Sequence, residues 1–244
     1  MWFKFCHLWV VTMDRSEINE IILESDAFIR SFGYQLPPFA YWTPATLQER
    51  VQTDSAMILD HALGWDITDY GKGIFRDLGL FLFTVRNGSR YNVDRGKGML
   101  YAEKIMISHE QQISPMHRHN FKTEDIINKG GAVLVLELFK ASPSGDIDQH
   151  AEVTVRTDGS ERKLPAGAHL KLQPGESVTL EPDCWHAFWG QGGSVLIGEV
   201  SNVNDDRTDN IFRDPIGRFS KIKENTEPTH LLVSDYDTWL KGPK

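Results

Sequence analysis

From Leu78 onward the sequence is a series of short runs rich in β-branched and aromatic residues, separated by turn signals such as Asn87-Gly88 and Asp158-Gly159. Short runs at such intervals predict an all-β sandwich or barrel. No long helical pattern lies between them, which argues against a parallel βαβ sheet, and no repeat of fixed period is present. The runs are LGLFLFTV, MLYAEKIMIS, AVLVLELF, AEVTV, ESVTL and SVLIGEVS.

The N-terminal part of the chain has a different texture. Apolar residues between Ser16 and Phe32 fall at helical spacing, and Gly33 follows as a stop signal. A proline-bearing stretch comes next, with a short helix expected from Ala45 to Leu63. We therefore expect residues 13–77 to form a helical arm packed on a barrel, and residues 78–244 to form the metal-binding barrel with a C-terminal extension.

The first twelve residues, MWFKFCHLWVVT, are aromatic and apolar. They are shorter than the roughly 20 residues that a spanning helix needs, and they lack the basic start and cleavage site of a signal peptide. We interpret residues 1–12 as an extended leader, with Met13 as the natural start. A membrane anchor and a buried segment of the fold are the alternatives.

Charge and cysteine content narrow the function classes. The formal net charge is -8 and no basic run is present, which disfavours nucleic acid as a partner, and no segment predicts membrane insertion. Cys6 and Cys184 are the only cysteines, so neither a disulfide framework nor a paired-cysteine metal knuckle is predicted. These features favour a cytoplasmic protein.

The segment SPMHRHNFKTEDIINKGG carries the strongest chemical signal. His117 and His119 are separated by one residue in a region of strands, so their imidazoles project from the same face. Glu124 follows closely enough for its carboxylate to return to the same point. Taken alone, two such histidines are weak evidence for a metal site.

A third histidine, His186, follows in the stretch LKLQPGESVTLEPDCWHAFW, where we expect it at the end of another strand. Any one of these histidines alone is more often a structural residue, but the set in this order predicts a metal site. Three imidazoles and one carboxylate suit Mn²⁺, Fe²⁺, Co²⁺, Ni²⁺ or Zn²⁺. A six-coordinate ion would keep two open positions, which indicates catalysis rather than a structural role.

These residues resemble the two sequence motifs of the cupins, which implies a cupin β-barrel of the jelly-roll type. The first motif is matched by His117, His119, Glu124 and Gly131, and the second by Gly175 and His186. Two departures put the turn geometry in doubt, but not the ligands. The glycine expected before the first histidine is Gln111, and Glu181-Pro182-Asp183 stands where Pro-x-Gly is usual.

A closer resemblance covers most of the chain from Met13. The runs PMHRHNFKTEDIINKGG, EPDCWHAFWG and GEVSNVNDDRTDN are similar to the bacterial D-lyxose isomerases, cupin sugar isomerases that use manganese. The resemblance implies interconversion of D-lyxose and D-xylulose with Mn²⁺ as cofactor, and D-mannose to D-fructose as a side activity. Barrels of this type tend to cover exposed strand edges by pairing, so we also expect a homodimer.

Moving a proton between C1 and C2 of an open-chain sugar needs a Lewis acid and a base. Lys122 lies between His119 and Glu124 in the sequence, where an adjacent cation would depress its pKa. It is our first choice as the base, or as the group that holds the enediolate oxygen. Glu199 is the second choice, because an acidic residue inside the run VLIGEVS is costly unless it is paired or functional.

Residues 202–210 form an acidic and amide-rich tract that offers groups for recognising hydroxyls. We note Asp205 and Asp206 as substrate contacts, with a solvated turn as the alternative. Trp185 packs in the barrel or stacks on the apolar face of a sugar.

Two rival functions use the same residues. A non-haem iron dioxygenase of the cupin class would need Fe²⁺ and would consume oxygen, and the fold does not decide between the two chemistries. A non-catalytic sugar-binding cupin would bind its ligand without turnover.

Overall fold

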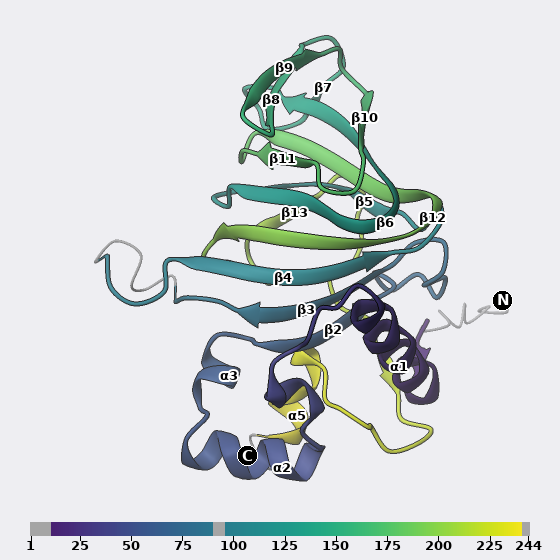
Figure 1. Cartoon of the computed structure of the whole chain (residues 1–244), viewed down its shortest axis with the longest axis vertical. Coiled ribbons are helices and arrows are strands. Elements are labelled where there is room, and N and C mark those ends of the chain that lie inside the picture. The colour runs from purple at the N-terminus through teal and green to yellow at the C-terminus, as the bar shows by residue number, and fades with distance from the viewer. Residues whose placement is uncertain (1–10, 90–95, 241–244) are drawn as a thin grey trace, which may run out of the picture.

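The computed structural model describes residues 11–89 and 96–240, and within these ranges the chain is dominated by one antiparallel sheet of 12 strands (Figure 1). The leader expected at residues 1–12 lies almost entirely outside the described residues, so its interpretation stays a prediction. The strands of the main sheet are β2 (Gly64–Thr68), β3 (Leu80–Arg86), β4 (Tyr101–Ser108), β5 (Ser114–His119), β6 (Glu124–Ala141), β7 (Ile147–Asp148), β8 (Val153–Thr157), β9 (Ser160–Leu164), β10 (Ala168–Leu172), β11 (Ser177–Leu180), β12 (Cys184–Asn202) and β13 (Asn210–Phe212).

The sheet follows the order β2-β3-β4-β12-β6-β11-β8-β9, with β5, β7, β10 and β13 paired to the sides of this path. Strand β12 is the hub, because it pairs with β4, β5 and β6. Within the described strands the path does not return to β2, so the barrel is open along one side. The predicted all-β fold of the cupin jelly-roll type, with helices at its N-terminal side, is confirmed.

Each of the predicted β-rich runs overlaps a strand, and two of them belong to strands much longer than expected. The run AVLVLELF is part of β6, and SVLIGEVS is part of β12. Strand β6 turns at Gly131, which has φ 95° and whose added Cβ would lie 2.3 Å from the carbonyl oxygen of Ser194. Only glycine allows the two strands to approach so closely there.

The N-terminal arm covers the outer face of β2, β3 and β4 (Figure 1). Its first helix buries Ile18, Ile22 and Ile29 against the aromatic side chains of Phe81 and Phe83. Because the inner face of β3 is also covered, its run of apolar residues is continuous rather than alternating. The helices are α1 (Arg15–Ser31), α2 (Pro44–Thr53), α3 (Met57–Asp60) and α5 (Tyr236–Trp239), and the 3₁₀ turns are η1 (Pro38–Tyr41) and η2 (Val233–Asp235).

Two local expectations differ from the structure. The single helix expected over Ala45–Leu63 is two helices, because the amides of Asp54 and Ser55 both donate to the carbonyl of Arg50 and end α2 there. The arm is also not entirely helical, since β2 lies within it and pairs with β3. The domain boundary at Leu78 stays a prediction. Among the described helices, none is long and apolar enough to cross a membrane.

The C-terminal extension returns to the N-terminal arm. Strand β14 (Ile222–Lys223) pairs in parallel with β1 (Met13–Asp14). Next to this pair the fully buried Arg15 donates hydrogen bonds to Asp235 at 2.8 and 2.9 Å and to Glu224 at 2.7 and 2.9 Å. The two ends of the described chain are therefore joined by a buried cation held between two carboxylates.

Replacing Arg15 with methionine leaves the buried carboxylate of Asp235 without its cation. We expect Arg15→Met to lower the free energy of unfolding by about 3 to 5 kcal/mol, measured by urea denaturation. The matched control is Arg156→Met, because Arg156 is 64% exposed in its pair with Glu181, and its loss should cost less than about 1 kcal/mol. Equal losses in the two variants would contradict a special role for the buried pair.

Candidate metal centre

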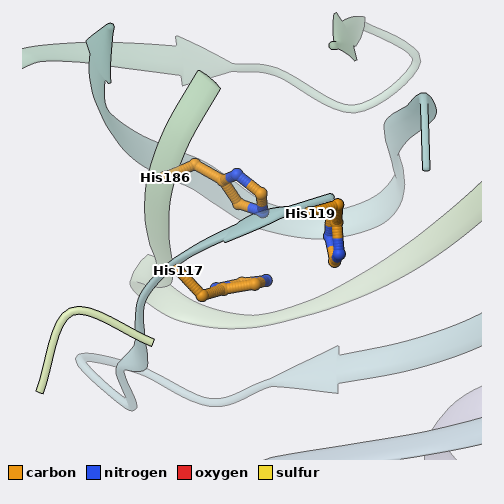
Figure 2. Close-up of side chains that lie close together, drawn as sticks. All are labelled: His117, His119 and His186. Atoms are coloured by element: carbon orange, nitrogen blue, oxygen red, sulfur yellow. The ribbon is translucent and has the colours of Figure 1, made fainter. Parts of the chain in front are cut away.

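Three histidine side chains converge on one point inside the barrel (Figure 2). His117 and His119 project from β5, and His186 comes from β12, where it is paired directly with His117 across the two strands. One ligand nitrogen from each ring lies within 4.8 Å of the others. The structure thus brings the three predicted histidines together, and His186 lies near the start of its strand rather than at the end of one.

Backbone carbonyls fix two of the three rings. Nδ1 of His117 lies 2.8 Å from the carbonyl oxygen of Pro115, and Nδ1 of His186 lies 3.1 Å from that of Cys184. Each Nδ1 therefore carries the proton and leaves the lone pair on Nε2. Burial and the neighbouring imidazoles hold the pKa of His117 well below its usual 6.5, so this ring is neutral.

The surroundings of His186 Nε2 are those expected of a ligand to a divalent ion. This nitrogen is buried and has no hydrogen-bond partner among the described residues. A buried polar atom without a partner is costly, whereas a neutral imidazole nitrogen aimed at two others is a normal metal ligand. The donor set is thus one that a divalent transition-metal ion would satisfy.

Glu124, the first residue of β6, closes the group from the other side. Its Oε1 lies 3.2 Å from Nε2 of His119 and 3.2 Å from Nε2 of His186. Its Oε2 lies 2.6 Å from Nζ of Lys122. Burial alone would raise the pKa of Glu124, but the Lys122 ammonium and His119 outweigh it and hold that pKa well below its usual range. The carboxylate is therefore ionised and free to bind a cation.

A chain of alternating charges leads away from Glu124. Lys122 Nζ lies 2.8 Å from Oε1 of Glu199, which in turn lies 3.5 Å from Nζ of Lys104. Lys104 Nζ then lies 3.2 Å from Oδ1 of Asp206. The sheet register produces this order, because Glu199 of β12 is paired directly with Lys104 of β4 and both side chains point into the barrel.

The side chain of Lys122 is surrounded by carboxylates. Burial favours the neutral amine, but the carboxylates of Glu124 and Glu199 outweigh burial and raise the pKa of Lys122 above its usual value. Lys122 is therefore held as an ammonium ion in this arrangement. The expectation of a depressed pKa concerns Lys122 beside a bound metal ion, and it stays a prediction.

Sequence reasoning missed Asp209, which organises the loop between the ligands. Its Oδ1 accepts a hydrogen bond from the amide of Phe121 at 3.0 Å, and its Oδ2 accepts one from the amide of Lys122 at 3.2 Å. The same Oδ2 lies 3.7 Å from Nδ1 of His119. Asp209 thus fixes the backbone of the loop at Phe121 and Lys122 with one carboxylate, whereas the buried Nδ1 of His119 has no hydrogen-bond partner among the described residues.

An open cavity of about 40 Å³ lies beside His117 and is lined by both the charged chain and an apolar wall. Lys104 was also missed, although a lysine inside the apolar run MLYAEKIMIS carries the same signal as Glu199. The lining residues are Tyr70, Leu80, Leu82, Lys104, Met106, Ser114, His117, Lys122, Glu124, Ile126, Phe188, Glu199, Asp206, Asn210, Phe212 and Arg218.

Asp206 reaches the cavity, but two of the expected substrate contacts do not. Trp185 points to the opposite face of β12 from His186, packs against Met116 and Phe139, and donates a hydrogen bond to the carbonyl of Gly145 at 3.1 Å. Asp205 belongs to a turn, where its carboxylate accepts hydrogen bonds from Arg207 and Thr208. The contacts of Trp185 and Asp205 within the chain are those of a packed residue and a turn residue, and their role as substrate contacts stays a prediction.

Comparison with known proteins gives a consistent result. The profile of the D-lyxose isomerase family matches residues 13–236. The D-lyxose/D-mannose isomerase of Serratia proteamaculans is 45% identical over 226 residues, covering 92% of this chain and 98% of the relative. The D-lyxose/D-mannose isomerase of Escherichia coli O157:H7 is 42% identical over 226 residues, with the same coverage of 92% and 98%.

Solved structures agree at the level of the fold. The L-ribose isomerase of Acinetobacter sp. DL28 in complex with L-ribose matches with a TM-score of 0.57 at 15% identity, covering 87% of this chain and 99% of that one. Ligand-free L-ribose isomerase of Cellulomonas parahominis matches with a TM-score of 0.56 at 17% identity, covering 88% and 100%. These likenesses bear on the fold alone and agree with the cupin architecture.

Because Asp209 holds the loop between the ligands, Asp209→Asn should weaken Mn²⁺ binding by about 10-fold or more. An asparagine has one acceptor oxygen in place of two, so it cannot accept from the amides of both Phe121 and Lys122, which explains the expected loss. Isothermal titration of chelator-stripped protein with Mn²⁺ measures the dissociation constant. Asp214→Asn, at an exposed carboxylate paired with Arg213, is the control and should leave the constant unchanged. Identical constants in the two variants would remove Asp209 from the metal centre.

Proposed function

Because the chain belongs to the D-lyxose isomerase family and is an aldose–ketose isomerase, we propose that it interconverts D-lyxose and D-xylulose, with D-mannose and D-fructose as a second substrate pair. Membership of this family also argues against the two rival functions, the iron dioxygenase and the non-catalytic sugar-binding cupin. The homodimer and the cytoplasmic location stay predictions.

We propose that the divalent ion is bound by His117, His119, Glu124 and His186. The observation that carries it is the buried meeting point of these side chains, with an unpartnered Nε2 on His186 and an ionised carboxylate opposite. We propose Mn²⁺ as the resident ion, with Co²⁺, Fe²⁺, Ni²⁺ and Zn²⁺ as ions that the same donors accept. When bound, such an ion supplies a Lewis acid that polarises the sugar carbonyl.

We assign the proton transfer to Glu199. Its carboxylate lines the cavity and is held by the ammonium of Lys122 and by Ser201 Oγ, which donates to Oε1 at 3.3 Å. A carboxylate fixed in this way can take the proton from C2 of an open-chain aldose and return it to C1, while the proton of the C2 hydroxyl passes to O1, so that the aldehyde becomes an alcohol and the C2 alcohol becomes a ketone. We therefore assign Glu199, rather than Lys122, as the base.

Lys122 and Lys104 take an electrostatic role. As ammonium ions inside a buried site, they would stabilise the negative charge that develops on the sugar oxygens during proton transfer. Lys122 bridges Glu124 and Glu199, so it also fixes the distance between the metal ligand and the base. This role corresponds to the alternative in which Lys122 holds the enediolate oxygen.

The charge balance of the cavity supports a neutral substrate. The cations Lys104, Lys122 and Arg218 line it together with the carboxylates Glu124, Glu199 and Asp206. No excess of positive charge remains for a phosphate group, which concentrated cations normally recognise. The many donors and acceptors match the hydroxyls of an unphosphorylated sugar.

The test is to strip the protein with chelator, add back Mn²⁺ and assay D-lyxose for ketose formation, with Glu199→Gln and His117→Ala beside the wild type. We expect turnover only with metal, and a loss of kcat of about 100-fold or more in Glu199→Gln. That variant should keep Mn²⁺ binding, whereas His117→Ala should lose it.

Glu181→Gln is the matched control, since Glu181 is an exposed carboxylate outside the cavity. It should behave as the wild type. Metal-loaded wild type that forms no ketose from either D-lyxose or D-mannose would contradict the proposed substrates. Full activity in Glu199→Gln would contradict the assignment of the base.

A further inference from the structure

Arg218 is a cavity residue supplied by the C-terminal extension rather than by the barrel strands. Its backbone is fastened to the end of β2, because Thr68 Oγ1 donates to the carbonyl of Arg218 at 2.8 Å. Two residues later, Ser220 Oγ accepts a hydrogen bond from the amide of Asp69 at 2.8 Å. The arginine is therefore held at a fixed place on the cavity wall.

The guanidinium group of Arg218 is only partly satisfied. Its Nη2 lies 2.7 Å from Oδ2 of Asp66 and 3.5 Å from Oδ2 of Asp206. Its Nη1 is buried and has no hydrogen-bond partner among the described residues. A buried guanidinium nitrogen without an acceptor is costly, and because Arg218 is a residue of the cavity wall, a sugar hydroxyl bound there would supply the missing acceptor.

The position of Arg218 along the chain of charges places it away from the reaction. Proton transfer is assigned to Glu199, which contacts Lys104 at 3.5 Å. Lys104 contacts Asp206, and Asp206 contacts Arg218. Arg218 is thus separated from the base by two further charged groups, on the side away from Glu124.

We propose that Arg218 determines substrate specificity by donating a hydrogen bond from Nη1 to the terminal hydroxyl of the sugar. This inference rests on the proposed function, in which C1 and C2 lie between the metal ligands and Glu199. A sugar held there extends along Lys104 and Asp206 and presents its last hydroxyl to Arg218. The two carboxylates that hold the guanidinium fix its direction before the sugar arrives.

The contact is remote from the bonds that change. A hydrogen bond that is equally strong in the bound sugar and in the transition state alters KM and leaves kcat largely unchanged. Loss of a charged hydrogen bond to a substrate hydroxyl is expected to raise KM by about 10-fold to 100-fold. Arg218 is accordingly a binding residue in this scheme, without a part in proton transfer.

The experiment compares D-lyxose with 5-deoxy-D-lyxose, which carries hydrogen in place of the terminal hydroxyl. Steady-state kinetics are measured with the Mn²⁺-loaded wild type, Arg218→Met and Arg218→Lys, and with Arg156→Met as a control at an exposed arginine. For each variant, the change in kcat/KM relative to the wild type is taken for both sugars. Comparing these changes cancels differences in ring opening between the sugars and in the fraction of active protein.

We expect Arg218→Met to lower kcat/KM for D-lyxose by about 10-fold or more through KM, and for 5-deoxy-D-lyxose by less than about 2-fold. Arg218→Lys should fall between the wild type and Arg218→Met, and Arg156→Met should change neither sugar. Equal losses on both sugars would reduce Arg218 to a structural role and overturn the proposal. No loss on either sugar would overturn it as well.

A second variant guards against misfolding, because Arg218→Met leaves the buried carboxylate of Asp66 without its cation. Asp66→Asn keeps the cation but loosens its direction, and it should show the same selective loss on D-lyxose to a smaller degree. Equal losses on the two sugars in Asp66→Asn would also count against the proposal. Failure of the proposed function has a separate signature, since the wild type would then turn over neither sugar.

Discussion

The carboxylate of Glu124 lies 2.6 Å from the Lys122 ammonium and 3.2 Å from an imidazole nitrogen of both His119 and His186, in a place closed to solvent. A charge buried this deeply is stable only if it is paired and hydrogen-bonded. Glu124 therefore requires the lysine on one side and a cation or proton on the other. The other polar groups of the site compensate the buried negative charge of this single carboxylate.

The pairing of the strands brings the residues of the site together. Strand β12 pairs with β4, β5 and β6, so it delivers His186 to the histidines of β5 and Glu199 to the lysine of β4. The outer face of β3 and β4 packs against α1, so the strands that carry the site are held from behind by an apolar cluster. The C-terminal extension completes the site with Asp206, Asp209 and Arg218. Arg15 then ties that extension back to the arm.

The sequence predicts the part of this site that depends on local rules. The strand runs and the shared face of His117 and His119 follow from alternation along a strand, and the motif order brings in Glu124 and His186. Family resemblance adds the sugar, which spacing alone does not provide. These predictions hold because each one needs only a few neighbouring residues or a motif of known order.

The parts that the sequence does not predict depend on distant pairing. Lys104 reaches Glu199 only because of the β4–β12 register, and Asp209 reaches the ligand loop from a later segment. The pairing of Lys122 with Glu199 was not predicted for the same reason, because Glu199 comes from a different strand. Gln111 stands where the usual cupin motif has a glycine. It adopts φ 58°, the left-handed conformation that a glycine would favour, so the structure tolerates this departure from the motif.

X-ray absorption spectroscopy of the Mn²⁺-loaded protein tests the central claim, that His117, His119, His186 and Glu124 hold one ion together. We expect one ion per chain after dialysis, with scattering from three imidazole rings and the rest of the inner shell made of oxygen. An ion surrounded by oxygen alone, or no ion retained, would contradict the metal centre and the chemistry that depends on it.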